Sequence, residues 1–452
     1  MRSRLLLSSF VLFIAVPLAA QVSIKYQRLS LANGLNVIFH EDHSLPTVAV
    51  NLWYHVGSAR EKPGRTGFAH LFEHIMFEGS GNVPEGKFDE WLEAAGGDNN
   101  ASTSSDRTNY FENGPRSALD LMLFLESDRA AYLLKTMSPA KVDGQRDVVK
   151  NERRQSYENR PYGMASLVID SSLYPPYHPY HWPTIGSMED LTAASYDDVI
   201  DFFKKYYVPN NASLVIAGDI NPSAAKVQAE KWFNEVSPAA IVPPIDRPAA
   251  FLSQEKRLVL EDNVQLPRLY MAWLSPPVLT PGDAELDVLA NVLAGGKNSR
   301  LYKRLVYDMQ IAQDVSAFQA SSELSSSFQI VVTARSGHTL SEILAVIQTE
   351  IDKLKAEEPS SREVQRAING FEASFLNRLE NLGGKADQLN SYFVNTGNPD
   401  YFNEDLARYK ALGPSDIQSV AQTYLRDDAR VVLSVVPKGK LELALPDKKG
   451  GN

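Results

Sequence analysis

The residues with the clearest chemical potential in this chain are two histidines and a glutamate, His70, Glu73 and His74, in the stretch Gly67–Ser80. On a helix the two histidines are one turn apart, so both imidazoles leave the same face and can reach one metal ion. Hydrolysis at zinc needs neutral nitrogen ligands, an open position for water, and a carboxylate that takes the proton of the water. Glu73 suits the last role because it lies at the rim of the ligand face. The order His-x-x-Glu-His is the inverted form of the commoner zinc pattern. The alternative is a half-exposed helix that binds no metal.

A third protein ligand must come from a separate element, because zinc in a catalytic site usually takes three. The candidate is Glu152, in the stretch Gln145–Gln155, which contains neither Pro nor Gly and is predicted to be helical. The residue types alone do not distinguish Glu152 from Asp147 or Glu158.

In these segments the chain resembles the pitrilysin and insulin-degrading-enzyme family, and specifically its short, mitochondrial-processing-peptidase-like branch. The matching residues are the motif His70–His74, the run Val-Val-Lys-Asn-Glu ending at Glu152, and the segments Gly96–Ala101 and Asn159–Gly163. The similarity runs from roughly Tyr26 to Pro437. It implies that Glu152 is the third ligand and that the chain holds one Zn²⁺.

The resemblance also implies a substrate-binding role for Asn100, Ala101 and Ser102, in a polar, extended segment that reaches Phe111. In the family this strand lies at the edge of a cleft and pairs with the substrate backbone, a mode that tolerates many sequences. The alternative is a plain solvent-facing strand.

Gln145 occupies the position where the family often has a second glutamate. Because an amide cannot ionise, its support of the site is limited to hydrogen bonding.

The bulk properties narrow the class of protein. A net charge of -10 and a pI near 5.4 argue against nucleic acid or an anionic membrane as the main partner. The absence of cysteine excludes disulfides, thiolate metal sites and a cysteine nucleophile. A chain of 452 residues with 44% hydrophobic content can build more than one core.

Residues 1–20 have the layout of a secretory signal. Arg2 and Arg4 precede an apolar run from Leu5 to Val16, and small residues lead to the expected cleavage site after Ala20. The run is shorter than the roughly 20 residues that a spanning helix needs, although an uncleaved anchor is the alternative. The mature protein is therefore expected to be periplasmic or secreted, without a membrane span.

The elements that must position these residues form two similar units. A helix over residues 196–207 followed by a buried strand over 212–218 has the same layout as residues 415–424 followed by 429–436. This repetition predicts an internal duplication. The expected fold is α+β, with two homologous domains, each a mainly antiparallel sheet with helices packed on one face. The predicted boundaries are 21–236 for the zinc-binding domain, 237–255 for a linker, 256–440 for the second domain and 441–452 for a tail.

Two shorter stretches complete the expected arrangement. Asn33-Gly34 between apolar runs predicts a hairpin. The aromatic, proline-rich residues 174–183 are expected to form a rigid surface cover rather than to line a cleft.

The second domain has no His-x-x-Glu-His, and its only histidine is His338. The helix expected at Asp283–Leu293 is the equivalent of the motif helix. In catalytically self-sufficient relatives an arginine and a tyrosine, seven positions apart, help to position substrate; here these positions hold Val306 and Gln313. Arg300 and Tyr307 have the spacing but lie elsewhere. The resemblance therefore implies a homologous partner subunit that supplies the pair, in a heterodimer, with a homodimer as the alternative.

The sequence as a whole predicts a zinc-dependent endopeptidase that cleaves peptides or unfolded polypeptides in a cleft between two domains. Glu73 would act as the base on the attacking water. One alternative is a non-catalytic assembly or peptide-binding subunit of a processing-peptidase-like complex. Another is zinc-dependent hydrolysis of something other than peptides.

Overall fold

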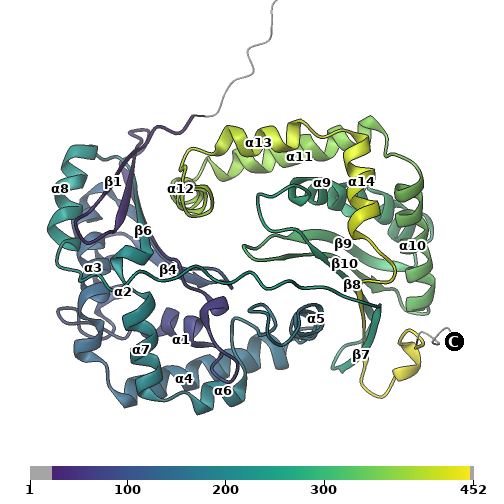
Figure 1. The fold of residues 1–452 in the computed structure, drawn as a ribbon, viewed down its shortest axis with the longest axis horizontal. Coiled ribbons are helices and arrows are strands. Elements are labelled where there is room, and N and C mark those ends of the chain that lie inside the picture. The colour runs from purple at the N-terminus through teal and green to yellow at the C-terminus, as the bar shows by residue number, and fades with distance from the viewer. Residues whose placement is uncertain (1–22, 448–452) are drawn as a thin grey trace, which may run out of the picture.

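The chain forms two halves that lie side by side and are joined by an extended segment (Figure 1). The structure, a computed structural model, describes residues 23–447. The expected signal peptide, residues 1–20, lies outside the described residues, as do residues 448–452 of the expected tail. Within residues 23–447 no helix combines the length and the apolar character needed to cross a bilayer. Residues 234–255, which are all described, contain no helix or strand.

The first half is built on a six-stranded sheet in the order β1-β2-β6-β3-β5-β4. Its strands are β1 (Gln27–Ser30), β2 (Asn36–Glu41), β3 (Thr47–Tyr54), β4 (Asp98–Thr103), β5 (Thr108–Pro115) and β6 (Ala212–Gly218). All neighbours are antiparallel except β2 and β6. The predicted Asn33-Gly34 hairpin joins β1 to β2, and Gly34 has φ 90°, a backbone conformation that glycine adopts without strain.

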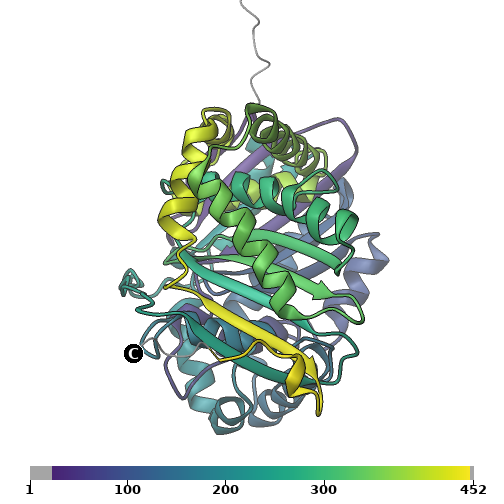
Figure 2. The same cartoon turned by 90° about the vertical axis from the view of Figure 1, so that its right-hand side faces the viewer.

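The second half repeats this arrangement. Its strands are β7 (Lys256–Asp262), β8 (Arg268–Ser275), β9 (Ala312–Ala320), β10 (Ser326–Ala334) and β11 (Val431–Pro437), in the order β7-β11-β8-β10-β9. The β7 and β11 pair is parallel and the others are antiparallel. Figure 2 shows the yellow strand β11 in this sheet. Apart from β1, the two strand orders correspond one to one, and the predicted duplication is confirmed.

The helices follow the same repetition. They are α1 (Phe68–Ile75), α2 (Lys87–Ala94), α3 (Leu119–Thr136), α4 (Pro139–Arg153), α5 (Ala165–Leu173), α6 (Met188–Ala193), α7 (Tyr196–Tyr206), α8 (Pro222–Phe233), α9 (Asp283–Ala294), α10 (Leu340–Ala356), α11 (Ser361–Arg378), α12 (Leu382–Thr396), α13 (Phe402–Lys410) and α14 (Pro414–Tyr424). The helices α7 and α14 begin in the same way, because Asp198 accepts from the N–H of Ser195 at the start of α7 and Asp416 accepts from the N–H of Gly413 at the start of α14.

One helix of each half packs on the sheet of the other half, and we call these two helices the lent helices. The helix α12, from the second half, packs on β3 and β6 of the first sheet, and α5, from the first half, packs on β8 and β11 of the second. Figure 1 shows α12 beside the first half and α5 beside the second. The remaining helices of each half cover one face of its sheet, as predicted. The lent helix lies on the other face.

Two segments differ from their predicted form. The polar segment after Asn100 is a hairpin of β4 and β5, because Ser104 accepts hydrogen bonds from the N–H groups of Asp106 and Arg107 and turns the chain. The expectation that residues 174–183 are a surface cover is wrong for two of their tyrosines, although Tyr177 is exposed. Tyr174 and Tyr180 are buried in a cluster with β11, between the two halves.

Candidate metal centre

The helix α1 is amphipathic, and this decides which way its polar residues face. Its apolar residues recur at the spacing of one helix face and are buried: Phe68, Leu71, Phe72 and Ile75. The Phe72 ring packs 5.0 Å from the ring of Tyr207, just after α7. Since this face is fixed against the core, His70, Glu73 and His74 emerge on the opposite face, and α1 packs against α4.

The three predicted ligands lie together. The Nε2 atoms of His70 and His74 are 3.7 and 3.2 Å from Oε2 of Glu152. A tetrahedral zinc with bonds of about 2.0 to 2.1 Å would hold its donors about 3.4 Å apart. Within residues 23–447 no other three His, Asp or Glu side chains converge in this way. The donor set and its spacing therefore fit one zinc ion.

The structure shows which of the three candidate carboxylates, Glu152, Asp147 and Glu158, can act as the third ligand. Asp147 is exposed on α4, and Glu158 contacts the guanidinium of Arg153 at 3.3 Å. The helix α4 begins at Pro139, where the Ser138 hydroxyl accepts from the N–H of Lys141, and a π-helical turn over Arg154–Glu158 follows its last residue. Only Glu152 of the three reaches the histidines of α1.

The protonation states suit a cation. Burial lowers the pKa of His70 to about 4, so its imidazole is neutral near pH 7. Its buried Nδ1 atom has no hydrogen-bond partner among the described residues. The contact with His74 lowers the pKa of Glu152, against the opposing effect of burial. A neutral imidazole and an ionised carboxylate are the forms that bind zinc.

Glu73 is held beside the donors by the neighbouring strand. The Thr103 hydroxyl, at the end of β4, donates to its carboxylate at 2.6 Å. Burial raises the pKa of Glu73, and the Thr103 hydrogen bond opposes that rise. A carboxylate with a raised pKa is suited to accept a proton near neutral pH. The role of Thr103 was not predicted from the sequence. Its signal was its position two residues after Ala101, on the same face of an extended strand.

The strand β4 ends the sheet, and among the described residues no strand pairs with its outer edge. Across the hairpin the N–H of Ser104 donates to the carbonyl of Arg107. Antiparallel pairing alternates, so the main-chain groups of Ala101 and Thr103 point to the open edge, and those of Asn100 and Ser102 point to β5. Of the three predicted substrate-binding residues, only Ala101 thus offers its main chain at the edge. The Asn100 side chain accepts from the Ala101 N–H at 2.8 Å, and the Ser102 hydroxyl donates to Asn109.

The remaining predicted positions lie outside the donor group. The Gln145 amide donates to Glu78, just after α1, rather than to any of the three converging side chains. In the second half Arg300 is already bonded to both oxygens of Glu363, at 2.7 and 3.1 Å, and this contact lowers the pKa of Glu363 to about 2. Tyr307 is 74% exposed. Arg300 is therefore engaged within its own half.

Two family models match the chain. A family model described as Insulinase (Peptidase family M16) matches residues 36–170, and one described as Peptidase M16 inactive domain matches residues 193–371. The first match contains all three converging donors and the second lies mainly in the half without them.

Curated relatives cover almost the whole chain. The chain is 28% identical over 420 residues to "Zinc protease PqqE" of Helicobacter pylori, covering 91% of this chain and 93% of that protein. It is 24% identical over 425 residues to "Probable mitochondrial-processing peptidase subunit beta, mitochondrial" of Arabidopsis thaliana, covering 90% and 78%. A crystal structure of a protease from Helicobacter pylori superimposes with a TM-score of 0.86 at 26% identity, over 92% of this chain and 100% of that one.

Proposed function

The chain belongs to the M16, or insulinase, family of peptidases, in its mitochondrial-processing-peptidase-like branch, and from this premise we propose that it is a zinc-dependent endopeptidase. The observation that carries the proposal is the convergence of His70, His74 and Glu152, with Glu73 beside them on α1. The substrates are peptides or unfolded polypeptides, because an open strand edge binds extended chains through main-chain hydrogen bonds.

Each residue has a separate task in this proposal. His70, His74 and Glu152 would hold the ion. A zinc ion, when bound, acts as a Lewis acid towards the scissile carbonyl and lowers the pKa of water to about 7. Glu73 accepts the proton of the attacking water and returns it to the leaving amine. Thr103 holds the Glu73 carboxylate through its hydroxyl, and the main-chain carbonyl of Ala101 pairs with the substrate backbone, since the Ala101 N–H donates to Asn100.

We also propose that the chain is exported and works with a homologous subunit. The arrangement of residues 1–20 supports export to the periplasm or beyond. The second half carries Val306 and Gln313 where self-sufficient relatives have an arginine and a tyrosine, and Arg300 is bonded to Glu363. A partner with the arginine and tyrosine would complete the site in a heterodimer, and a second copy of this chain is the alternative.

The test is hydrolysis of a quenched fluorescent peptide library by the mature chain, alone and with a co-expressed homologue carrying the missing pair. Zinc content is measured on the same samples. The variant Glu73→Gln should lower kcat by about 10² to 10⁴ while zinc stays bound, since it removes only the base.

The outcomes separate the competing functions. Activity of the chain alone would exclude an obligatory partner, and activity only with the homologue would support the heterodimer. Zinc bound without hydrolysis under either condition would favour a peptide-binding or assembly subunit. Cleavage of other substrate classes, but not of peptides, would contradict the endopeptidase.

A further inference from the structure

The start of the helix that carries the histidines lacks the usual cap. The first four N–H groups of a helix have no acceptor within it, and a Glu or Gln at the third helical position often supplies one. In α1, which begins after Gly67, the third position is His70, whose Nε2 faces Glu152. A metal donor thus occupies the position from which a side chain would close the end of the helix.

The equivalent helix of the second half shows the local solution. The helix α9 also begins after a glycine in the left-handed conformation, Gly282 with φ 97°, as Gly67 has φ 90°. Its third residue is Glu285, and the Glu285 carboxylate accepts from the N–H of Gly282 at 2.9 Å. Two helices with the same backbone start therefore differ at the third position, where one has a capping glutamate and the other has a histidine.

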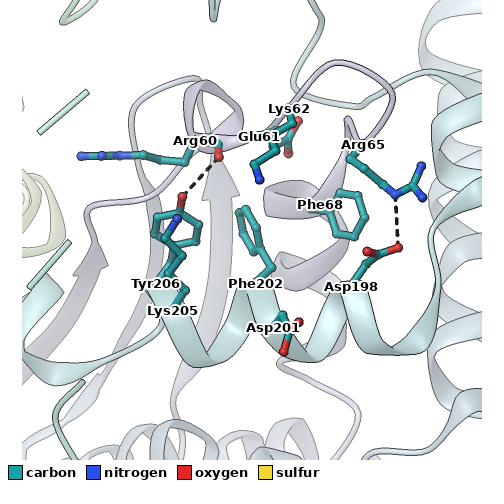
Figure 3. A pocket seen from close by; sticks show the side chains of 10 residues that line it. All are labelled: Arg60, Glu61, Lys62, Arg65, Phe68, Asp198, Asp201, Phe202, Lys205 and Tyr206. Carbon is teal, nitrogen blue, oxygen red and sulfur yellow. Dashed lines mark hydrogen bonds and ion pairs between the residues drawn. The ribbon is translucent and has the colours of Figure 1, made fainter. Parts of the chain in front are cut away.

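In the first half a glutamate upstream of the helix, Glu61, accepts from the N–H groups at its start. Glu61 follows the short 3-10 turn Ser58–Arg60 and is only 8% exposed. Its two carboxylate oxygens accept from the N–H of Gly67 at 2.9 Å and from the N–H of Ala69 at 2.8 Å. Burial raises the pKa of Glu61 well above its usual range, and the hydrogen bonds from these N–H groups together with the helix dipole oppose that rise. Figure 3 shows Glu61 with its neighbours Arg60 and Lys62, beside Phe68, the first residue of α1.

The start of α1 is also linked to the helix that carries Glu152. Gly67 packs so closely on Gly186 that a Cβ added to Gly186 would lie 2.5 Å from the Gly67 Cα. The Gly186 carbonyl accepts from the guanidinium of Arg153, the residue after Glu152. The start of α1 is thus in contact with a segment that also holds the residue next to Glu152.

We infer that Glu61 is a positioning residue for the proposed metal centre: it closes the N-terminus of α1 because His70 cannot, and so fixes both histidines relative to Glu152. The inference rests on the proposed function, in that the three donors are taken to hold zinc. Glu61 itself does not touch the donors in this account; it acts through the main chain of Gly67 and Ala69.

The test compares two glutamate-to-glutamine changes of the same size. Glu61→Gln replaces one acceptor oxygen with a donor and removes the charge, and Glu285→Gln makes the same change at the start of α9. Zinc affinity is measured by chelator competition, and the absorption spectrum of the Co²⁺-substituted protein reports the donor geometry. We expect Glu61→Gln to bind zinc about tenfold more weakly, with an altered Co²⁺ spectrum, as for other residues that orient metal ligands. Its kcat should fall about 10-fold to 100-fold with KM within about twofold. Glu285→Gln should keep the wild-type zinc affinity.

Two results would overturn the inference: wild-type zinc affinity and spectrum in Glu61→Gln, or equal weakening in Glu285→Gln, which would indicate a general loss of stability. If Glu61→Gln does not fold, Glu61→Asp decides the same question, because it keeps the charge but is one methylene too short to reach both N–H groups. A wild-type protein that binds zinc but cleaves no peptide would contradict the proposed function, and the zinc comparison would still decide the role of Glu61.

Discussion

At the scale of single residues, the three donors His70, His74 and Glu152 are already in the protonation states that bind a cation. Glu152 is drawn to His74 at 3.2 Å, and His70 is kept neutral by burial. A neutral imidazole and a carboxylate both keep free lone pairs, so the contact between Glu152 and His74 leaves atoms available to bind a metal ion. The group can therefore bind a divalent ion at neutral pH by exchanging one weak contact for three bonds.

The first prediction separates Glu152 from a neighbouring acid on the same helix. Glu152→Gln should lower zinc affinity by at least about tenfold, because an amide is a poorer zinc ligand than a carboxylate. Asp147→Asn, an exposed change on α4, should leave zinc affinity unchanged. Zinc content after dialysis against a graded chelator series measures both. Equal zinc loss in the two variants would mean that the charge of α4, and not the Glu152 ligand, holds the ion.

The second prediction concerns Asp287 on α9, far in sequence from the metal group. Burial raises the pKa of Asp287 to about 7, although the Tyr409 hydroxyl donates to it at 2.7 Å. Between about pH 4 and pH 7 the folded protein therefore keeps a proton that the unfolded chain has lost, so this group makes stability fall as pH rises through that window.

Asp287→Asn removes this titration but keeps an acceptor for Tyr409. The Tm of the variant, relative to wild type, should rise by about 2 °C between pH 5 and pH 8. Differential scanning calorimetry at the two pH values measures the change, with Asp147→Asn as the exposed control. A constant difference in Tm between pH 5 and pH 8 would show that Asp287 does not titrate in this range.

At the scale of elements, the two lent helices explain the composition of the central strands. Every residue of β6 is buried. Leu214 and Ile216 belong to the core beneath the helices of the first half, and Val215 and Ala217 to the cluster with α12. A strand covered on both faces needs a continuous apolar run, where a strand with one wet face would alternate.

Local pattern predicted such elements but not their partners. The uniform apolar run of β6 indicated burial on both faces, and the three-to-four spacing of α1 indicated which residues face the metal. The exchange of α5 and α12 depends on contacts between distant segments, which no local period encodes. Glu152 was likewise chosen by resemblance and not by residue type. Glu61 was missed because its partners are main-chain N–H groups, which leave no mark on the sequence.

The third prediction tests whether α12 supports the first half. Leu389 of α12 is fully buried against the first sheet, so Leu389→Ala should cost about 2 to 5 kcal/mol. Amide hydrogen exchange followed by mass spectrometry should speed up in β3 and β6. The matched change Leu354→Ala on α10, which is buried in the second half alone, should speed up exchange there instead. Identical exchange patterns in the two variants would mean that the halves open as one unit.

At the scale of the whole molecule, the two halves meet where their equivalent hairpins turn. The carboxylate of Asp106, in the turn between β4 and β5, accepts from the N–H of Glu323, in the turn between β9 and β10, at 3.0 Å. Tyr180 joins the same contact, since its hydroxyl donates to Asp106 and accepts from the N–H of Leu324 at 2.9 Å. Burial raises the pKa of Asp106, so an unpaired Asp106 would be costly there. Parting the halves at this point must break the two of these hydrogen bonds that cross between them, from the N–H of Glu323 to Asp106 and from the N–H of Leu324 to Tyr180.

Tyr180→Phe should therefore favour the parted form without changing the donors. It leaves the Leu324 N–H and one Asp106 oxygen without their partner, at a cost of about 1 to 3 kcal/mol for each buried group. Amide exchange in residues 321–325 should rise by about tenfold, and small-angle scattering should give a larger radius of gyration. Tyr177→Phe is the matched control, because Tyr177 lies in the same loop but is 60% exposed and its hydroxyl reaches only the carbonyl of Ala249 in the connecting segment. Unchanged exchange in Tyr180→Phe would show that the remaining contacts between the halves, among them α5, α12 and the hydrogen bonds of Tyr162 to Asp262 and Leu266, keep the turn closed after its hydrogen bonds are lost.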